Sequence, residues 1–576
     1  MTSPVDVVTV DVAVVGAGGA GLRAALEAAR SGARVAMIVK GRVGQSGTTA
    51  YHVAETAGFA AADGYCDPMD SPDVHLGDIV EAGCGMCDVR LARILAYESP
   101  KQIPFLEKLG VVFITNSDGR HAVVKGCFGS RPRNRKILGH GVPIVQALGA
   151  EVRRAGVYAI ENTGAVELLV DDGRCTGVVC ASAEGKVSVV KAAATVLATG
   201  GAGQLYAQNL NPPDITGDGY ALGFRAGAQL INMEFMQAGF GITSPVRNMV
   251  MTWLWLLNPN IRTRDGRDVL GQYLPAGVSA NACMAAKSKH YPFTSRDDSK
   301  YLEIAVQDQY RKANGSLQSE CYLDFSHIKS IDSSVNDHDL RAMLTITHEW
   351  MLKRGLDILR QPVPVTCFAH AINGGLRIDE NAETTLPGLY AAGEVAGGPH
   401  GADRLGGTMF AASQVFGARA GRAAAGRAAG QVLDLSLSYR ERRQVDEVLG
   451  TISDLRGRAA GVQADELRRD LQRTMSLNSL VCRTRKSLIK AAESVACLKT
   501  VSQTGLRVGP GGDVLDAVGI RNLLQVAEIV LGSALRREES RGSHYRADFP
   551  ERDRRYDWVT AVTRAGDGPE YSSIKL

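Results

Sequence analysis

Apolar positions near the start of the chain change their spacing twice. Residues 10–15 and 35–39 are nearly continuous apolar runs of strand length, whereas "GLRAALEAAR" between them repeats apolar positions at i, i+3 and i+4. This pattern predicts a strand, a helix and a second strand over residues 10–40. Two later apolar runs, "TVLATGGAG" (195–203) and "TLPGLYAAGEVAGG" (385–398), predict strands that end in glycine turns.

The last part of the chain has a different pattern. "LQRTMSLNSLVCRTRKSLIKAAE" and "GIRNLLQVAEIVLGSALRREES" repeat apolar residues at helical spacing and show no strand-like alternation. We therefore expect a helical region there.

The turn after the first strand fits the G-x-G-x-x-G motif. In this motif the first glycine makes a tight turn, the second lets the backbone meet a pyrophosphate, and the third lets helix and strand pack closely. The residues of the motif are Gly16, Gly18, Gly19, Ala20 and Gly21. The acidic residue that would bind a ribose is absent from the end of the second strand, where Lys40 stands. The motif thus predicts a dinucleotide site and leaves FAD and NAD open.

The two later glycine turns favour FAD. A nicotinamide domain usually shows one such turn, whereas a fold that wraps a whole flavin dinucleotide returns to it several times. The residues at these returns are Thr199, Gly200, Gly201, Asp218 and Glu394.

Composition and charge narrow the class of partner. The 576 residues, 45% of them hydrophobic, can form several domains, and 65 basic against 61 acidic side chains favour neither nucleic acid nor a membrane surface. The N-terminus lacks a signal-peptide pattern, and the apolar stretch 249–257 is too short to span a bilayer. Eleven scattered cysteines, with only Cys84 and Cys87 close together, indicate reduced thiols and no metal site. We expect a cytoplasmic protein with no direct membrane insertion.

Five segments together resemble one family of flavoproteins. They are "GAGGAGLRAA", "ATGGAG", "TGDGYALGFRAGA", "GLYAAGEVAGGPHGADRLGG" and "ALRREESRGSHYRADFPERD". They resemble the flavoproteins of succinate dehydrogenase, fumarate reductase and L-aspartate oxidase. The resemblance implies an α/β fold with a Rossmann-like FAD-binding domain (1–240 and 363–435), an inserted α+β capping domain (241–362) and a C-terminal helical domain (436–576).

The resemblance also implies the chemistry and the residues that anchor the substrate. It implies hydride transfer between flavin N5 and a carbon–carbon or carbon–nitrogen bond. Arg404, in "HGADR", and His370, in "CFAHAINGG", would hold a substrate carboxylate against the flavin. Relatives have asparagine where this chain has Asp403, which would either partly neutralise Arg404 or point away from it.

A first departure from the family concerns FAD attachment. Membrane-bound relatives carry a histidine covalently attached to FAD, whereas this chain reads "GQSGTTAY" with Gly47 in or near that position. The sequence therefore predicts noncovalent FAD. The remaining expected cofactor residues are Lys40, Gly41, Ser46, Gly47, Thr48, Thr49, Arg404, Gly407 and Met409.

A second departure lies in "NMEFMQAGFGITSP". Gly239 stands where relatives have a histidine that holds the other substrate carboxylate, while Gln237 and Thr252 remain as substrate-binding candidates. Bulky Trp253, Leu254 and Trp255 replace a polar loop, which suggests a substrate whose far end is larger or less charged than succinate. The alternative is that these three residues only pack the capping domain.

A third departure concerns the proton shuttle. In "TSRDDSKYLEIAVQDQYRK", Tyr301 stands where relatives have a catalytic arginine. A phenol can move protons if cations such as Lys300 or Arg296 lower its pKa. Alternatively Arg296 itself serves as the shuttle, or Tyr301 is a surface residue.

Three functions remain open from the sequence. The first is an FAD-dependent dehydrogenase, reductase or oxidase acting on a carboxylate-bearing substrate other than plain succinate. The second is the flavoprotein subunit of a larger reductase with an iron–sulphur partner, and the third is a flavin-binding protein without turnover. The electron acceptor and any homo-oligomer stay unspecified.

Overall fold

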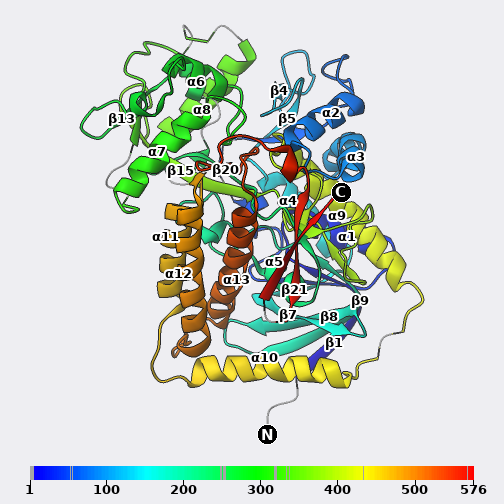
Figure 1. The fold of residues 1–576 in the computed structure, drawn as a ribbon. Coiled ribbons are helices and arrows are strands. Elements are labelled where there is room, and N and C mark those ends of the chain that lie inside the picture. Colours follow the sequence, from blue (N-terminus) through cyan, green and yellow to red (C-terminus); the bar gives the residue numbers. More distant parts are fainter. Residues whose placement is uncertain are drawn as a thin grey trace.

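The computed structural model describes residues 5–576 apart from 52, 55, 247–248, 251–253, 317–320, 332–333, 336–337, 433 and 567. It has the α/β architecture expected from the sequence, with a Rossmann-like sheet, a separate mixed region above it and a group of long helices beside it (Figure 1). The domain boundaries given above stay a prediction.

The central sheet contains the three strands that end in glycine turns. Strand order is β6-β2-β1-β9-β8-β7, and β17 pairs with the C-terminal half of β9. The pairs β1/β2, β1/β9 and β9/β17 are all parallel, so the carboxyl ends of β1, β9 and β17 meet at one edge of the sheet. The strands are β1 (Asp6–Val15), β2 (Val35–Val39), β6 (Tyr158–Glu161), β7 (Thr163–Asp171), β8 (Arg174–Ser182), β9 (Val187–Leu197) and β17 (Leu389–Ala391).

Two helices pack unusually closely beside this sheet. A Cβ atom at Gly421 of α9 (Thr408–Ala428) would lie 2.2 Å from the carbonyl oxygen of Ala24 in α1 (Gly19–Arg30). The small residues of "GARAGRAAAGRA" therefore bring α9 directly against α1. Helix α4 (Val142–Arg154) packs against α1, and helix α5 (Asp218–Arg225) packs against β7.

A small unit covers the cofactor end of the sheet. Its sheet has the order β3-β5-β4, with strands β3 (Thr56–Ala60), β4 (Val123–Lys125) and β5 (Pro132–Leu138). Helices α2 (Pro72–Gly83) and α3 (Val89–Lys108) pack beside it, and α3 also contacts α9.

The region drawn in green in Figure 1 has its own five-stranded sheet, in the order β12-β11-β15-β14-β13. Strands β11 and β15 pair with each other, with Gly239 opposite Phe368. The elements are β11 (Met236–Ile242), β12 (Met249–Val250), β13 (Asn260–Thr263), β14 (Cys321–Asp324), β15 (Val363–Ile372), α6 (Ala280–Lys287), α7 (Lys300–Lys312) and α8 (His338–Leu352).

The C-terminal part is helical, as expected, until residue 536. The stretch 471–493, expected to be helical, contains the end of one helix at Asn478 and the start of another after Thr484, whose side chain caps it. The helices are α10 (Tyr439–Gly457), α11 (Ala464–Asn478), α12 (Arg485–Thr504) and α13 (Val514–Arg536).

The chain then ends in strands rather than helix. Strand β20 (Tyr545–Arg546) pairs with β19 (Cys482–Arg483), which lies between α11 and α12. The hairpin of β21 (Val559–Ala565) and β22 (Gly568–Ile574) then joins a sheet of the order β18-β16-β10-β21-β22. The other members are β10 (Leu230–Ile231), β16 (Gly375–Arg377) and β18 (Ala396–Gly397). Within the described part of the chain, no helix combines the length and apolar character needed to cross a membrane.

Candidate functional site

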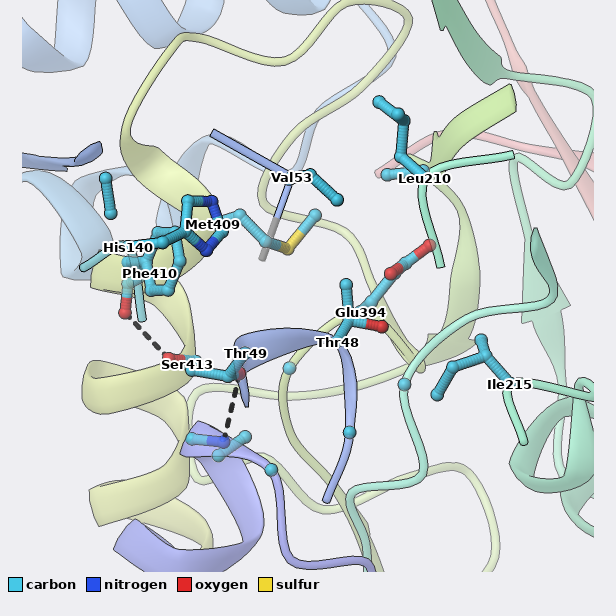
Figure 2. Close-up of a pocket in the computed structure, with 18 of the residues that line it drawn as sticks. Thr48, Thr49, Val53, His140, Leu210, Ile215, Glu394, Met409, Phe410 and Ser413 are labelled. Atoms are coloured by element: carbon cyan, nitrogen blue, oxygen red, sulfur yellow. Dashed lines mark hydrogen bonds between the residues drawn. The ribbon is translucent and has the colours of Figure 1, made fainter. Parts of the chain in front are cut away.

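The glycine motif after β1 closes the backbone tightly around the start of α1. A Cβ atom at Gly21 would lie 2.0 Å from the Gly16 carbonyl oxygen, and one at Gly16 would lie 2.4 Å from the Ala198 carbonyl oxygen. Gly18 caps the helix without a side chain, and the first turn contains no acidic residue. The amino end of α1 is therefore open to an anion such as a phosphate. The Thr49 hydroxyl accepts a hydrogen bond from Gly19 N at 3.2 Å beside it (Figure 2).

One long cavity runs from this helix end to His370 and Arg404. Most of the residues expected to bind the cofactor line it. They are Gly16, Gly18, Gly19, Ala20, Lys40, Gly41, Ser46, Gly47, Thr48, Thr49, Thr199, Gly200, Asp218, Glu394, Arg404, Gly407 and Met409. Gly21 and Gly201 do not line it, and instead allow close packing: a Cβ atom at Gly201 would lie 2.0 Å from a carboxylate oxygen of Glu394.

Lys40, which replaces the expected ribose-binding acid, is held by an acid from another element. Its ammonium group lies 2.5 Å from Asp218 and donates a hydrogen bond to the Thr216 hydroxyl at 2.9 Å. Asp214 also lines the cavity, and burial raises the pKa of its carboxyl. The end of β2 provides no carboxylate to this part of the cavity, and Asp214 and Asp218 provide carboxylates there instead.

Glu394 projects into the middle of the cavity from the turn after β17 (Figure 2). Its carboxylate accepts a hydrogen bond from Ile372 N at 3.0 Å. Packing around the carboxyl raises its pKa to about 7, so this group can be protonated near neutral pH.

Arg404 and His370, the two residues that the resemblance pairs, both line this cavity. Arg404 is 7% exposed; its Nε donates to Gln237 Oε1 at 3.1 Å and its Nη1 to the Leu405 carbonyl oxygen at 3.2 Å. No acidic side chain of the described residues forms an ion pair with it. Removal from water, together with Arg404, lowers the pKa of His370 to about 3, and its Nδ1 has no hydrogen-bond partner among the residues that the structure describes. A lone cation beside a neutral imidazole suits a carboxylate ligand.

Gln237 acts on Arg404 rather than on the cavity. Its side chain holds the Arg404 guanidinium, and its Nε2 donates to the Arg404 carbonyl oxygen at 3.4 Å. It is not among the lining residues, so the structure gives it a positioning contact instead of a substrate contact.

Asp403 does not neutralise Arg404. Its fully buried carboxylate accepts a hydrogen bond from the Thr294 hydroxyl at 2.7 Å, and burial raises its pKa to about 6. Of the two orientations open from the sequence, the carboxylate therefore takes the one away from the guanidinium.

The residues expected to shuttle protons lie elsewhere. Neither Tyr301 nor Arg296 lines the cavity, and Arg296 forms an ion pair with Glu81 at 3.2 Å. Lys300 lies over the Tyr301 ring, yet burial and nearby acids raise the pKa of Tyr301 instead of lowering it. The lowered pKa that a phenolic shuttle would need is therefore not found at Tyr301.

The bulky residues of the rebuilt loop pack in the capping region. Leu254 and Trp255 are buried, the Trp255 ring lies against Phe240 at a centroid distance of 4.8 Å, and neither lines the cavity. This agrees with the packing alternative for these two residues. Thr252 and Trp253 lie outside the described residues.

Several lining residues carry no motif that sequence reasoning could use. They come from β4, β5 and the turns around them, from the turn between α6 and α7, and from the start of α9. Examples are Lys125, Cys127, Asn134, Lys136, His140, Tyr291, Phe410 and Ser413. The sequence signal for Tyr291 is Gly239, which has no side chain, so that a residue of another segment fills the space beside it.

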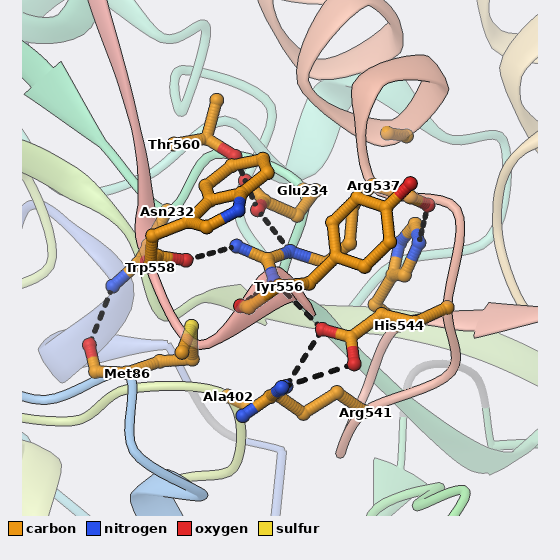
Figure 3. A network of polar contacts seen from close by, with 12 residues as sticks. Met86, Asn232, Glu234, Ala402, Arg537, Arg541, His544, Tyr556, Trp558 and Thr560 are labelled. Carbon is orange, nitrogen blue, oxygen red and sulfur yellow. Dashed lines mark hydrogen bonds and ion pairs between the residues drawn. The ribbon is translucent and has the colours of Figure 1, made fainter. Parts of the chain in front are cut away.

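A buried polar network holds the loop that carries Arg404 (Figure 3). Arg537 donates to Glu234 at 2.7 Å, and Arg541 donates to the carbonyl oxygen of Cys84 at 2.7 Å. The Ser543 hydroxyl donates to the Ala402 carbonyl oxygen at 2.8 Å. The segment after α13 therefore fixes the backbone two residues before Arg404.

Comparisons with known proteins agree with this geometry. Residues 11–409 match the family described as "FAD binding domain", and residues 468–574 match "Fumarate reductase flavoprotein C-term". The chain is 34% identical to a subunit of the fumarate reductase (CoM/CoB) of Methanothermobacter marburgensis over 96% of both chains. It is 32% identical to L-aspartate oxidase of Streptomyces coelicolor over 95% of this chain and 90% of that one.

Solved structures are similar over nearly the whole chain. Sdh1 of Mycobacterium smegmatis superposes with a TM-score of 0.85 at 28% identity, covering 99% of this chain and 95% of that chain. A quinol-fumarate reductase chain gives a TM-score of 0.83 at 28% identity and covers 99% of both chains.

Proposed function

Because this chain belongs to the FAD-dependent oxidoreductase family of fumarate reductase and L-aspartate oxidase flavoproteins, we propose that it moves a hydride between FAD and a carboxylate-bearing substrate. The observation that carries the proposal is Arg404, a buried cation with no acidic partner among the described residues, at the end of the cavity beside His370. A buried charge of this kind is stabilised when an anion binds it.

The residues present fit FAD. The open amino end of α1 suits the pyrophosphate, and the cavity extends from there past Glu394 to Arg404. Bound FAD would supply flavin N5 as the atom that takes or gives the hydride. Gly47 lines the cavity with no side chain to offer for a covalent link, which supports noncovalent FAD.

The proposed substrate has one carboxylate, held by Arg404 and His370. Gln237 orients the guanidinium, and the neutral His370 ring offers hydrogen bonding without a second positive charge. Gly239, at the position where relatives have a histidine for the second carboxylate, supports a substrate other than plain succinate, such as a longer acid or an amino acid.

The test begins with the purified protein. We expect acid precipitation to release a yellow chromophore, and anaerobic addition of succinate, L-aspartate or a larger acid to bleach it, or an unsaturated acid to reoxidise the reduced protein. Arg404→Ala should weaken the response at least about tenfold, because the loss of one charge-assisted anchor in a buried site costs about 1.5–3 kcal/mol. Arg440→Ala, at an exposed arginine of α10, is the matched control. A response that Arg404→Ala leaves as strong as in the unchanged protein contradicts the proposal.

A second candidate is the flavoprotein subunit of a larger reductase with an iron–sulphur partner. It is supported by the name of the Methanothermobacter relative, which is one subunit of a reductase, and by the likeness to a quinol-fumarate reductase chain. Affinity purification of the tagged chain from its own cells, followed by iron analysis and mass determination, tests this. Isolation of a single iron-free chain, or of a homo-oligomer, would rule it out. If none of the acids tested reduces or reoxidises the flavin of the purified protein, flavin binding without turnover becomes the better interpretation.

A further inference from the structure

The cavity wall next to His370 is built over two glycines of β11. A Cβ atom at Gly239 would lie 2.7 Å from the Tyr291 ring, and one at Gly241 would lie 2.4 Å from the Phe368 ring. Strand residues two apart share a face, so this face of β11 carries no bulk of its own. The side chain that fills the space at Gly239 is Tyr291, from the turn between α6 and α7.

The turn holds Tyr291 in a fixed place. Tyr291 N donates to Cys127 Sγ at 3.1 Å, and Phe293 N donates to the Ala238 carbonyl oxygen at 2.7 Å. The Tyr291 ring meets the His370 ring edge to face, with centroids 5.7 Å apart. Bonds on both sides of the residue therefore aim the ring at the end of the cavity where His370 lies.

The phenol hydroxyl has nothing to bind within the described structure. Tyr291 lines the cavity and is 3% exposed, and its hydroxyl has no hydrogen-bond partner among the described residues. His370 Nδ1 is in the same state. Buried polar groups are normally paired, so two unpaired groups side by side in one cavity indicate a ligand with matching polar atoms.

The surroundings of Tyr291 favour an uncharged ligand atom. It clusters with apolar Val53, Leu210 and Phe368. Burial raises the pKa of Tyr291 well above its ordinary value, and Glu303, Cys367 and Cys127 raise it further. The phenol is therefore protonated at neutral pH and can donate a hydrogen bond, in a place where a second carboxylate would lie against apolar side chains.

We propose that the Tyr291 hydroxyl donates a hydrogen bond to an uncharged oxygen of the substrate, beyond the carboxylate that Arg404 and His370 hold. The substrate class is then an acid whose second end is an amide, ester or ketone. This inference rests on the proposed function.

The test titrates the oxidised holoenzyme with fumarate and with its half-amide, fumaramate, and follows the flavin absorbance. The two probes have the same size and differ in one charge. In the unchanged protein the half-amide should bind at least as tightly as fumarate. Tyr291→Phe should weaken binding of the half-amide about tenfold, the usual loss for one hydrogen bond. Tyr206→Phe removes a hydroxyl from a buried tyrosine outside the cavity lining and should leave binding unchanged.

The outcomes separate the two proposals. Binding that depends on Arg404 but is indifferent to Tyr291→Phe overturns this inference alone, and so does fumarate binding more than about tenfold tighter than the half-amide. If neither acid changes the flavin spectrum of the unchanged protein, this inference fails, and if none of the acids of the earlier test does so either, the proposed function fails with it. If the phenol is purely structural, Tyr291→Phe should leave binding unchanged, because the hydroxyl has no hydrogen-bond partner to lose within the described part of the chain.

Discussion

At the scale of single residues, burial shifts the pKa values of the titratable groups in this site. His370 is neutral because removal from water lowers its pKa, and the partners of Arg404 among the described residues are the Gln237 amide and a backbone oxygen. Asp403 lies next to Arg404 in the sequence, yet it binds Thr294. The anion-binding character of the cavity end therefore depends on where one carboxylate points.

Asp403 should also leave a mark on the pH dependence of stability. Its pKa is raised to about 6 from an ordinary value of 3.8, so the native state binds this proton more tightly than the unfolded state. The free energy of unfolding then falls as pH rises from about 4 to about 6 and levels off above, by up to about 3 kcal/mol for this group.

Asp403→Asn should remove that fall, because the amide oxygen still accepts from Thr294 and no proton is lost. Thermal unfolding midpoints measured between pH 4 and 8 check this, with the exposed Asp172→Asn as control. Identical pH profiles for Asp403→Asn and the unchanged protein would refute the assignment.

At the scale of elements, the first βαβ unit works because β1 and α1 nearly touch. Gly21 lies over Gly16, and the same closeness recurs where Gly421 of α9 lies over α1. The elements can approach this closely because glycine has no Cβ atom at the points of contact. The open helix end is a consequence of this packing.

Gly21→Ala should therefore lower the free energy of unfolding more than a usual surface substitution does. The added methyl would lie 2.0 Å from a backbone oxygen, so α1 must shift away from β1 and the site at its amino end must deform. We expect about 1–3 kcal/mol of lost stability and a flavin-to-protein ratio well below that of the unchanged protein. Gly426→Ala in α9, where nothing lies within 4 Å, should keep its flavin and gain slightly in stability. Full flavin content in Gly21→Ala would show that the close packing is not needed.

At the scale of the whole molecule, the end of the chain reaches back to the site. Glu539 accepts from Arg537 at 2.7 Å and from Arg541 at 2.7 Å, and all three side chains are fully buried. Arg541 and Ser543 in turn hold backbone oxygens near the loop of Arg404. The segment after α13 is therefore part of the functional site although it does not line the cavity.

Two neighbouring glutamates test this network. Glu539→Gln leaves two buried arginines without their shared carboxylate and should cost about 3–5 kcal/mol. Glu538→Gln removes a partly exposed partner of Arg485 and should cost less than about 1 kcal/mol. Thermal unfolding and carboxylate binding of both variants provide the measurement. Equal, small effects would mean that the buried charges add nothing to the loop's position.

The sequence by itself determined the sheet edge and its glycine turns, and the resemblance to a flavoprotein family supplied the predicted pairing of His370 with Arg404. These depend on short-range features: apolar period, glycines where backbone must come close, and motifs a few residues long. Helical spacing within 471–493 and 519–540 predicted helix there, but no local pattern predicted the final strands, because β21 pairs with β10, more than 300 residues earlier.

Only the tertiary structure decided what surrounds the anion-binding end of the cavity. The partner of Asp403, the distance of Tyr301 from the cavity and the placement of Tyr291 over Gly239 all depend on how the capping region folds onto the sheet. Glycine at 239 showed from the sequence that a side chain was missing. Tyr291 fills this space because two segments about 50 residues apart in the sequence pack together, and no local sequence pattern predicts such a contact.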